Sequence, residues 1–174
     1  MLSFTERIIG AARLDVEVYE EVEADTDATG QAMSVVLLAS LAGGLGSVSF
    51  GAGGIGLFMV GGVVSLVGWA TWAFLIYVIG THVLPESGTR ADVGELMRTL
   101  GFAQSPGLLR FIGSLAGVGP LVLVVIQIWL LVAMVVAIRQ ALDYTSTWRA
   151  IGVCLIAWFV TSVVAAVLLI LVVG

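Results

Sequence analysis

The sequence predicts an all-α, polytopic integral membrane protein, on two observations. Residues 28–85, 111–138 and 150–174 contain no Asp, Glu, Lys or Arg. Long apolar stretches without charge indicate transmembrane helices, because a charge at the centre of a bilayer is costly. The seven basic residues are all arginines and lie outside these stretches. With 60% hydrophobic and only 11% charged residues, the chain carries too little charge for a soluble domain of this size.

We expect a bundle of five transmembrane helices, with approximate spans 29–49, 57–80, 96–118, 120–138 and 150–173. A span of about 20 residues, at about 1.5 Å per residue, crosses a hydrocarbon core of about 30 Å. The segment 93–118 allows two interpretations, because it contains Arg98, Pro106 and Arg110. It forms either a kinked third span or an interfacial helix followed by half a span.

The arginines choose between these interpretations. Basic residues are retained in cytoplasmic loops. If the third segment crosses, residues 1–27, 81–98 and 139–149 all face the cytoplasm, and the outer loops near 50–56 and 117–120 carry no charge. If it does not cross, Arg139 and Arg149 lie outside. We therefore expect five spans, with the N-terminus in the cytoplasm and the C-terminus outside.

The chain divides into an acidic helical segment, 1–27, and a membrane domain, 28–174. The first segment holds eight acids against Arg7 and Arg13, and it is too short and too charged to span. We expect it to lie along the cytoplasmic surface. Its charge disfavours nucleic acid and anionic lipid and could attract a basic protein, although a simply solvated surface has the same pattern. The candidate partner-facing residues are Glu20, Glu21, Glu23, Arg90 and Asp92.

Small residues recur along the first two spans. Ala39, Gly43 and Ser47 are spaced four apart, and Gly61 and Ser65 repeat the pattern in the second span. Such stripes let helix backbones approach closely in membranes. These five residues are therefore our candidates for helix packing.

Arg110 is the sharpest polar exception in the membrane domain. An intramembrane arginine usually faces the bundle, pairs with polar groups or reaches toward the interface. The uncharged spans contain no carboxylate for it, but Gln127 could accept a hydrogen bond. Arg110 and Gln127 form our candidate lipid or intramembrane polar site, with structural anchoring of the third span as the alternative.

No catalytic, metal or cofactor site is predicted. Residues 51–56 match G-x-G-x-x-G, but a membrane span precedes them and no acid occurs between Asp27 and Glu86. His82 is the only histidine, whereas a zinc site needs several ligands. We expect neither an enzyme nor a bound cofactor.

Three segments resemble the prokaryotic branch of the Yip (Ypt-interacting protein) domain family. Residues 15–25 read Asp-Val-Glu-Val-Tyr-Glu-Glu-Val-Glu-Ala-Asp, residues 99–109 read Thr-Leu-Gly-Phe-Ala-Gln-Ser-Pro-Gly-Leu-Leu, and residues 138–144 read Ile-Arg-Gln-Ala-Leu-Asp-Tyr. The resemblance implies five membrane helices and a cytoplasmic N-terminus. Eukaryotic relatives associate with Rab-type GTPases, but their Asp-Leu-Tyr-Gly-Pro motif is absent here, so Rab binding does not carry over.

The function we expect is that of a non-catalytic membrane protein, which organises the membrane or acts as a partner-binding scaffold. The alternatives are an accessory subunit of a larger membrane complex and a small transporter or channel. The expected surroundings are the lipid bilayer, in a prokaryotic cytoplasmic membrane, and a protein partner or further copies of the chain.

The topology can be tested with reporters. A reporter fused after Gly174 should lie outside the cytoplasm, and one replacing Ser87 should lie inside, because the arginines place the two positions on opposite sides. Protease accessibility or reporter activity in intact cells measures both. Two reporters on the same side would contradict the parity argument.

Overall fold

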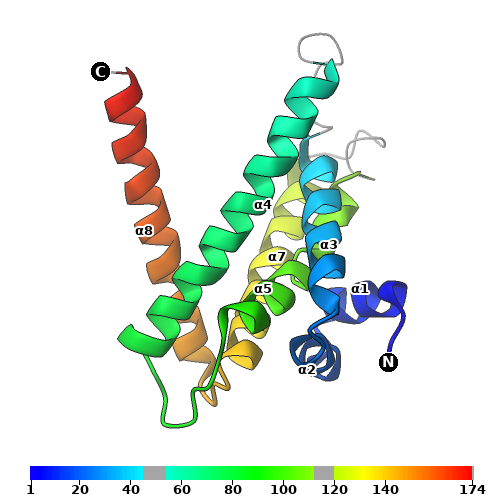
Figure 1. The fold of residues 1–174 in the computed structure, drawn as a ribbon, viewed down its shortest axis with the longest axis vertical. Coiled ribbons are helices and arrows are strands. Elements are labelled where there is room, and N and C mark those ends of the chain that lie inside the picture. Colours follow the sequence, from blue (N-terminus) through cyan, green and yellow to red (C-terminus); the bar gives the residue numbers. More distant parts are fainter. Residues whose placement is uncertain (45–53, 112–119, 174) are drawn as a thin grey trace.

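The computed structural model describes residues 1–44, 54–111 and 120–173. In these residues the only regular secondary structure is helical, and turns and loops connect the helices (Figure 1). The all-α prediction is thus confirmed for those residues. The described residues form seven α-helices, one π-helical turn (η1) and one 3₁₀ turn (η2). In chain order they are α1 (Phe4–Ala12), α2 (Val16–Ala24), α3 (Ala28–Gly44), α4 (Gly54–Val78), η1 (Ile79–Val83), α5 (Val93–Phe102), η2 (Ser105–Leu109), α7 (Pro120–Ala141) and α8 (Thr147–Val173).

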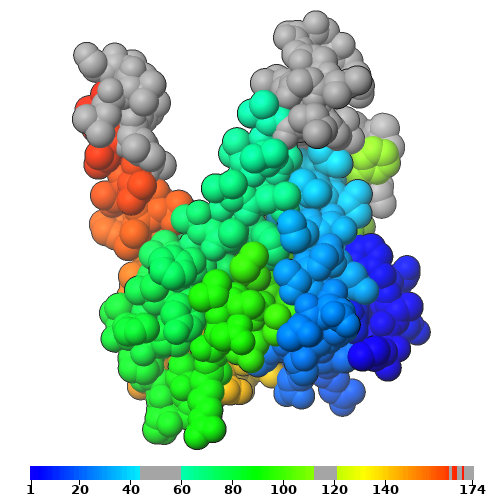
Figure 2. Space-filling view, in the orientation of Figure 1, coloured from blue at the N-terminus to red at the C-terminus, as the bar shows by residue number. Residues whose placement is uncertain are grey.

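The long helices stand side by side over a base formed by α1, α2 and the connecting loops (Figure 1). α5 contacts α3, α4 and α7, and η2 contacts α3 and α7, so this segment lies at the centre of the bundle. In the space-filling view, α5 fills the space between α4 and α3, and α1 lies against the lower part of α3 (Figure 2). α8 packs on α7 near the base and then diverges from α4 towards its C-terminal end (Figure 1).

The prediction of five transmembrane helices is met only in part by the described residues, which supply three helices of sufficient length. Among the described residues, three helical segments are long and apolar enough to cross a bilayer: Val60–Val83, Leu121–Ala141 and Thr147–Val164. The predicted first span contributes a shorter apolar helix, Ala28–Gly43, and residues 45–53 lie outside the described part of the chain. The predicted third span, 96–118, is not one helix in its described part, because α5 ends at Phe102 and only a 3₁₀ turn follows.

Pro106 explains why the third segment breaks. Proline has no amide hydrogen to donate to the carbonyl of residue 102, and its ring would collide with that carbonyl in a continuous helix. In the structure, the Ser105 hydroxyl donates to the Phe102 carbonyl oxygen at 2.6 Å. The Ser105 side chain thus replaces the missing backbone donor, and the chain continues as η2. Ser105 and Phe102 are both buried.

Close packing on α3 holds the broken segment in place. Gly101 lies against Ala32 so closely that an added Cβ would be 2.7 Å from the Ala32 Cβ and 3.2 Å from its Cα. Gly107 lies against Ala39 in the same way, with an added Cβ 3.3 Å from the Ala39 Cβ. Small residues on both sides allow this close approach.

The acidic N-terminal segment is part of the packed structure as well as of the surface. Arg7 is only 2% exposed, and its guanidinium is 2.6 Å from Asp25 and 3.1 Å from Glu21. The same side chain donates to the Gln31 amide oxygen at 3.0 Å. Arg7 therefore ties α1 to α2 and to the start of α3.

Gly101→Ala should lower the free energy of unfolding by about 1–3 kcal/mol, because the new methyl group collides with Ala32 and overpacks the core. Denaturation in mild detergent measures the loss. Gly61→Ala is the matched control: an added Cβ there meets nothing within 4 Å in the described structure. That control should leave stability unchanged or raise it by up to about 1 kcal/mol. Equal stability of the two variants would refute the close approach.

Arg7→Met should destabilise the protein by about 3 kcal/mol or more, because two half-buried carboxylates lose their cation. Arg13→Met, at an exposed arginine of the same segment, should change stability by no more than about 0.5 kcal/mol. Both values come from the same detergent denaturation curves. A loss for Arg7→Met no larger than that for Arg13→Met would mean that the Arg7 ion pairs are not what holds α1.

Candidate functional site

Apart from Arg110, the charged side chains of the described chain lie on α1, α2 and α5, in the turns beside α1 and α2, in the loop after η1, and at the adjoining ends of α7 and α8 with the turn between them. These elements lie together at the base of the bundle, so the charge is confined to one end (Figure 1). We call the surface formed by residues 1–27, 84–98 and 139–149 the charged end. The opposite halves of α4, α7 and α8 carry no charged side chain along their described length.

Arg98 connects α5 to α2 within the charged end. It is buried, and its Nε donates to the carbonyl oxygens of Val22 and Glu23 at 3.1 and 3.0 Å. Its Nη2 also donates to the Glu23 carbonyl. The last carbonyls of a helix have no partner within the helix and carry partial negative charge, so a guanidinium satisfies and stabilises them. Arg98 is therefore a structural clamp on the end of α2.

Glu86 and Tyr144 connect the loop after η1 to the turn between α7 and α8. The Glu86 carboxylate accepts from the Thr145 amide at 2.9 Å and its hydroxyl at 2.8 Å, and it lies 3.4 Å from the Arg149 guanidinium. The hydrogen bonds from Thr145 are the main cause that lowers the pKa of Glu86. The Tyr144 hydroxyl reaches two carbonyl oxygens, those of Gly80 and Leu84, at 2.8 Å each. The charged end is thus fixed by side-chain contacts between distant segments.

The structure separates the five partner-facing candidates into two groups. Glu20, Arg90 and Asp92 are exposed, although Glu20 also accepts from the Gln140 amide at 3.2 Å and Asp92 caps the start of α5. Glu21 is paired with Arg7 and only partly exposed. Glu23 is partly buried, and burial, with the neighbouring acids Glu95, Asp143 and Glu20, raises its pKa to about 7. Glu21 and Glu23 are therefore less accessible to a partner than Glu20, Arg90 and Asp92.

The structure brings Arg110 and Gln127 together. Arg110 follows η2, Gln127 lies on α7, and the guanidinium Nη2 donates to the amide oxygen at 2.6 Å. Gly43 packs on the same arginine, because an added Cβ would lie 3.5 Å from Nη1 of Arg110. That distance is an ordinary van der Waals contact, so among the described residues the neighbour of Gly43 is a side chain, and its expected contact with a helix backbone stays a prediction.

The other helix-packing candidates differ in their surroundings. Ala39 is buried against Gly107, whereas Gly61 is exposed with open space around it in the described structure. Ser65 lines a cavity described below. Ser47 lies outside the described residues. Sequence reasoning missed the glycines of the third segment, although Gly101 and Gly107 flank the Pro106 break and were visible in the sequence.

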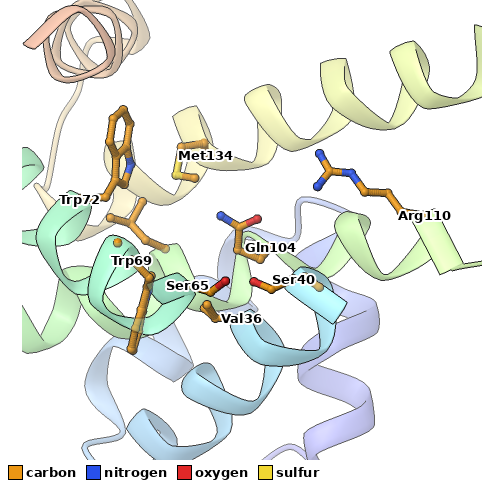
Figure 3. A pocket seen from close by; sticks show the side chains of 11 residues that line it. Val36, Ser40, Ser65, Trp69, Trp72, Gln104, Arg110 and Met134 are labelled. Carbon is orange, nitrogen blue, oxygen red and sulfur yellow. The ribbon is translucent and has the colours of Figure 1, made fainter. Parts of the chain in front are cut away.

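A cavity of about 370 Å³ lies between α3, α4 and α5, with Arg110 and the α7 residue Met134 on its wall. The residues that line it include Arg110, Gln104, Trp69 and Trp72. Gln104 lies between Arg110 and the two tryptophans, whose indoles point away from one another (Figure 3). The hydroxyls of Ser40 and Ser65 point towards each other below Gln104 (Figure 3). Among these cavity residues, the sequence analysis proposed only Arg110 and Ser65 as site residues. It missed Gln104, although Gln104 lies in the same apolar segment as Arg110.

Within the described residues, no three His, Cys, Asp or Glu side chains lie together in a way that could hold a metal ion. His82 lies in η1, where its Nδ1 is 2.7 Å from the Thr81 hydroxyl. Cys154 is buried on α8, and burial in an apolar helix makes a thiol unreactive.

Comparison with known proteins agrees with this architecture. No curated protein and no solved structure matched the chain. The family model of the Yip1 domain matches residues 16–169, which begins at the first residue of α2 and reaches into the last turns of α8. The predicted resemblance to the Yip family is confirmed, whereas its prokaryotic branch stays a prediction. Since the match covers most of the sequence, the chain belongs to the Yip1 domain family.

Proposed function

We propose that this Yip1-domain protein is a non-catalytic integral membrane scaffold, which binds protein partners through its charged end. The observation that carries the proposal is the fixed acidic face of α1 and α2. Because Arg7 is buried among carboxylates, it contributes no positive charge to the surface. The exposed charges of residues 1–27 are Arg13 and the five acids Glu6, Asp15, Glu17, Glu20 and Asp27.

A surface of this kind suits a basic partner. The clamps made by Arg7, Arg98 and Glu86 hold the segments of the charged end before any partner arrives. A surface that is ordered beforehand loses less conformational entropy on binding. Complementary charge then speeds association and favours partners of the opposite sign.

The apolar part supports placement in a membrane. Three described helical segments have the length and composition to cross a bilayer, and large apolar side chains cover their outer surfaces. A Yip1 domain with such helices fits an integral membrane protein. The proposed orientation, with the charged end in the cytoplasm of a prokaryotic cell, rests on the distribution of arginines.

An accessory subunit of a larger complex is the second candidate. The observation that favours it is the divergence of α8, whose outer side chains, such as Trp158 at 64% exposure, have few neighbours in this chain (Figure 1). Such a helix could pack on another membrane protein. The two candidates therefore differ in the surface that meets the partner.

Purification from the source cells in mild detergent distinguishes them. Charge reversal in the double variant Glu17→Arg, Glu20→Arg should reduce the co-purifying partner at least about tenfold, and raised salt should weaken wild-type recovery, because exposed charges are screened. Quantitative mass spectrometry of the co-purified chains measures both. Trp158→Ala is the matched control and should retain the partner. Loss of the partner with Trp158→Ala alone would favour the accessory subunit and contradict the scaffold.

A further inference from the structure

The cavity beside Arg110 has an excess of hydrogen-bond donors. Arg110 supplies a positive charge, and no carboxylate is among the described residues that line the cavity. The contact to Gln127 uses one terminal nitrogen of the guanidinium and brings no negative charge. A guanidinium carries five N–H donors, so most of its capacity can serve another acceptor.

Two tryptophans add donors to the same wall. Trp69 is 7% exposed, and the indole Nε1 atoms of Trp69 and Trp72 are shielded from solvent. Within the described residues, neither Nε1 has a hydrogen-bond acceptor. Buried polar groups nearly always find a partner, and a buried N–H without one costs free energy. Two such donors on the wall that also holds Arg110 indicate an acceptor supplied from outside the chain.

We propose that this cavity binds an oxyanion, specifically a phosphate group, with its charge at Arg110, and that the unpaired indoles of Trp69 and Trp72 serve as further donors to the bound molecule. Arginine is the side chain best suited to phosphate oxygens, since its planar fork donates two parallel hydrogen bonds. Ser40, Ser65 and Gln104 provide additional polar contacts (Figure 3). The cavity volume of about 370 Å³ falls in the range of small-ligand sites.

A membrane lipid and free phosphate are the two sources of such a group. Gly43, which contacts Arg110, is about 22 Å along α3 from its start at the charged end, at about 1.5 Å per residue. Arg110 therefore lies towards the opposite end of the bundle, where its long side chain could meet a lipid headgroup. The apolar lining residues Val36, Leu100 and Met134 would accept the first part of an acyl chain.

Native mass spectrometry and titration of the full chain in detergent test the proposal with three probes: dioctanoyl phosphatidylglycerol, dioctanoylglycerol and inorganic phosphate. The phosphatidylglycerol should bind, and dioctanoylglycerol, which has the same tails without phosphate, should bind at least about tenfold more weakly. Displacement of the lipid by millimolar phosphate would identify free phosphate as a second occupant. Binding of the lipid without such displacement would identify the headgroup as the source.

Variants place the binding in the cavity. Arg110→Gln should weaken phosphatidylglycerol binding about tenfold or more, and Trp69→Phe should weaken it a few-fold by removing only the indole donor. Arg13→Gln and Trp148→Phe, at exposed positions outside the cavity, are matched controls and should bind as the wild type does. If Arg110→Gln fails to fold, Trp69→Phe still decides. Equal binding of the two glycerol probes, unchanged affinity in the folded cavity variants, or no binding to wild type would overturn the proposal.

Discussion

The close contact between the third segment and α3 is the constraint on which most of the structure depends. Gly101 and Gly107 let this segment lie against Ala32 and Ala39, in the centre of the bundle. From there Arg98, on α5, reaches the end of α2, while Arg110, after η2, reaches the cavity. The break at Pro106 makes both possible, because it divides one apolar segment into two pieces with different directions. A continuous straight helix would not place Arg98 at the end of α2 and Arg110 at the cavity.

Three arginines show how the fold deals with positive charge in different surroundings. Arg7 is paired with carboxylates near the surface, where ionised partners remain available. Arg98 uses backbone carbonyls at the end of a helix, which need a donor in any case. Arg110 lies between apolar helices and has only a neutral amide as a hydrogen-bond partner among the contacts the structure gives it. Of these three arginines, it is the one whose charge is least compensated by the described protein.

The two proposed surfaces lie in different parts of the molecule. The acidic face is formed by the short helices at the base, whereas the cavity opens among α3, α4 and α5 within the bundle. The same broken segment contacts both regions, through Arg98 in one and Gln104 with Arg110 in the other. Each surface keeps its own chemistry, with exposed carboxylates for a basic protein and buried donors for an oxyanion. A partner at the base and a ligand in the cavity would therefore meet elements of one packed unit.

Local patterns in the sequence determined the helical class, the family and the grouping of charge. Uncharged apolar stretches marked the long helices, and the isolated polar residues Arg110 and Gln127 indicated one another. The tertiary structure alone decided how many of the described helices are long enough to span a bilayer. A helix can end where other groups satisfy its backbone, as the Ser105 hydroxyl does for the Phe102 carbonyl next to Pro106. The tertiary structure also decided that Gly43 contacts Arg110, that Glu23 is partly buried, and that two indoles share a wall with that arginine. These features arise between segments far apart in the chain, and the spacing of residues within one helix carries no information about which neighbour it meets.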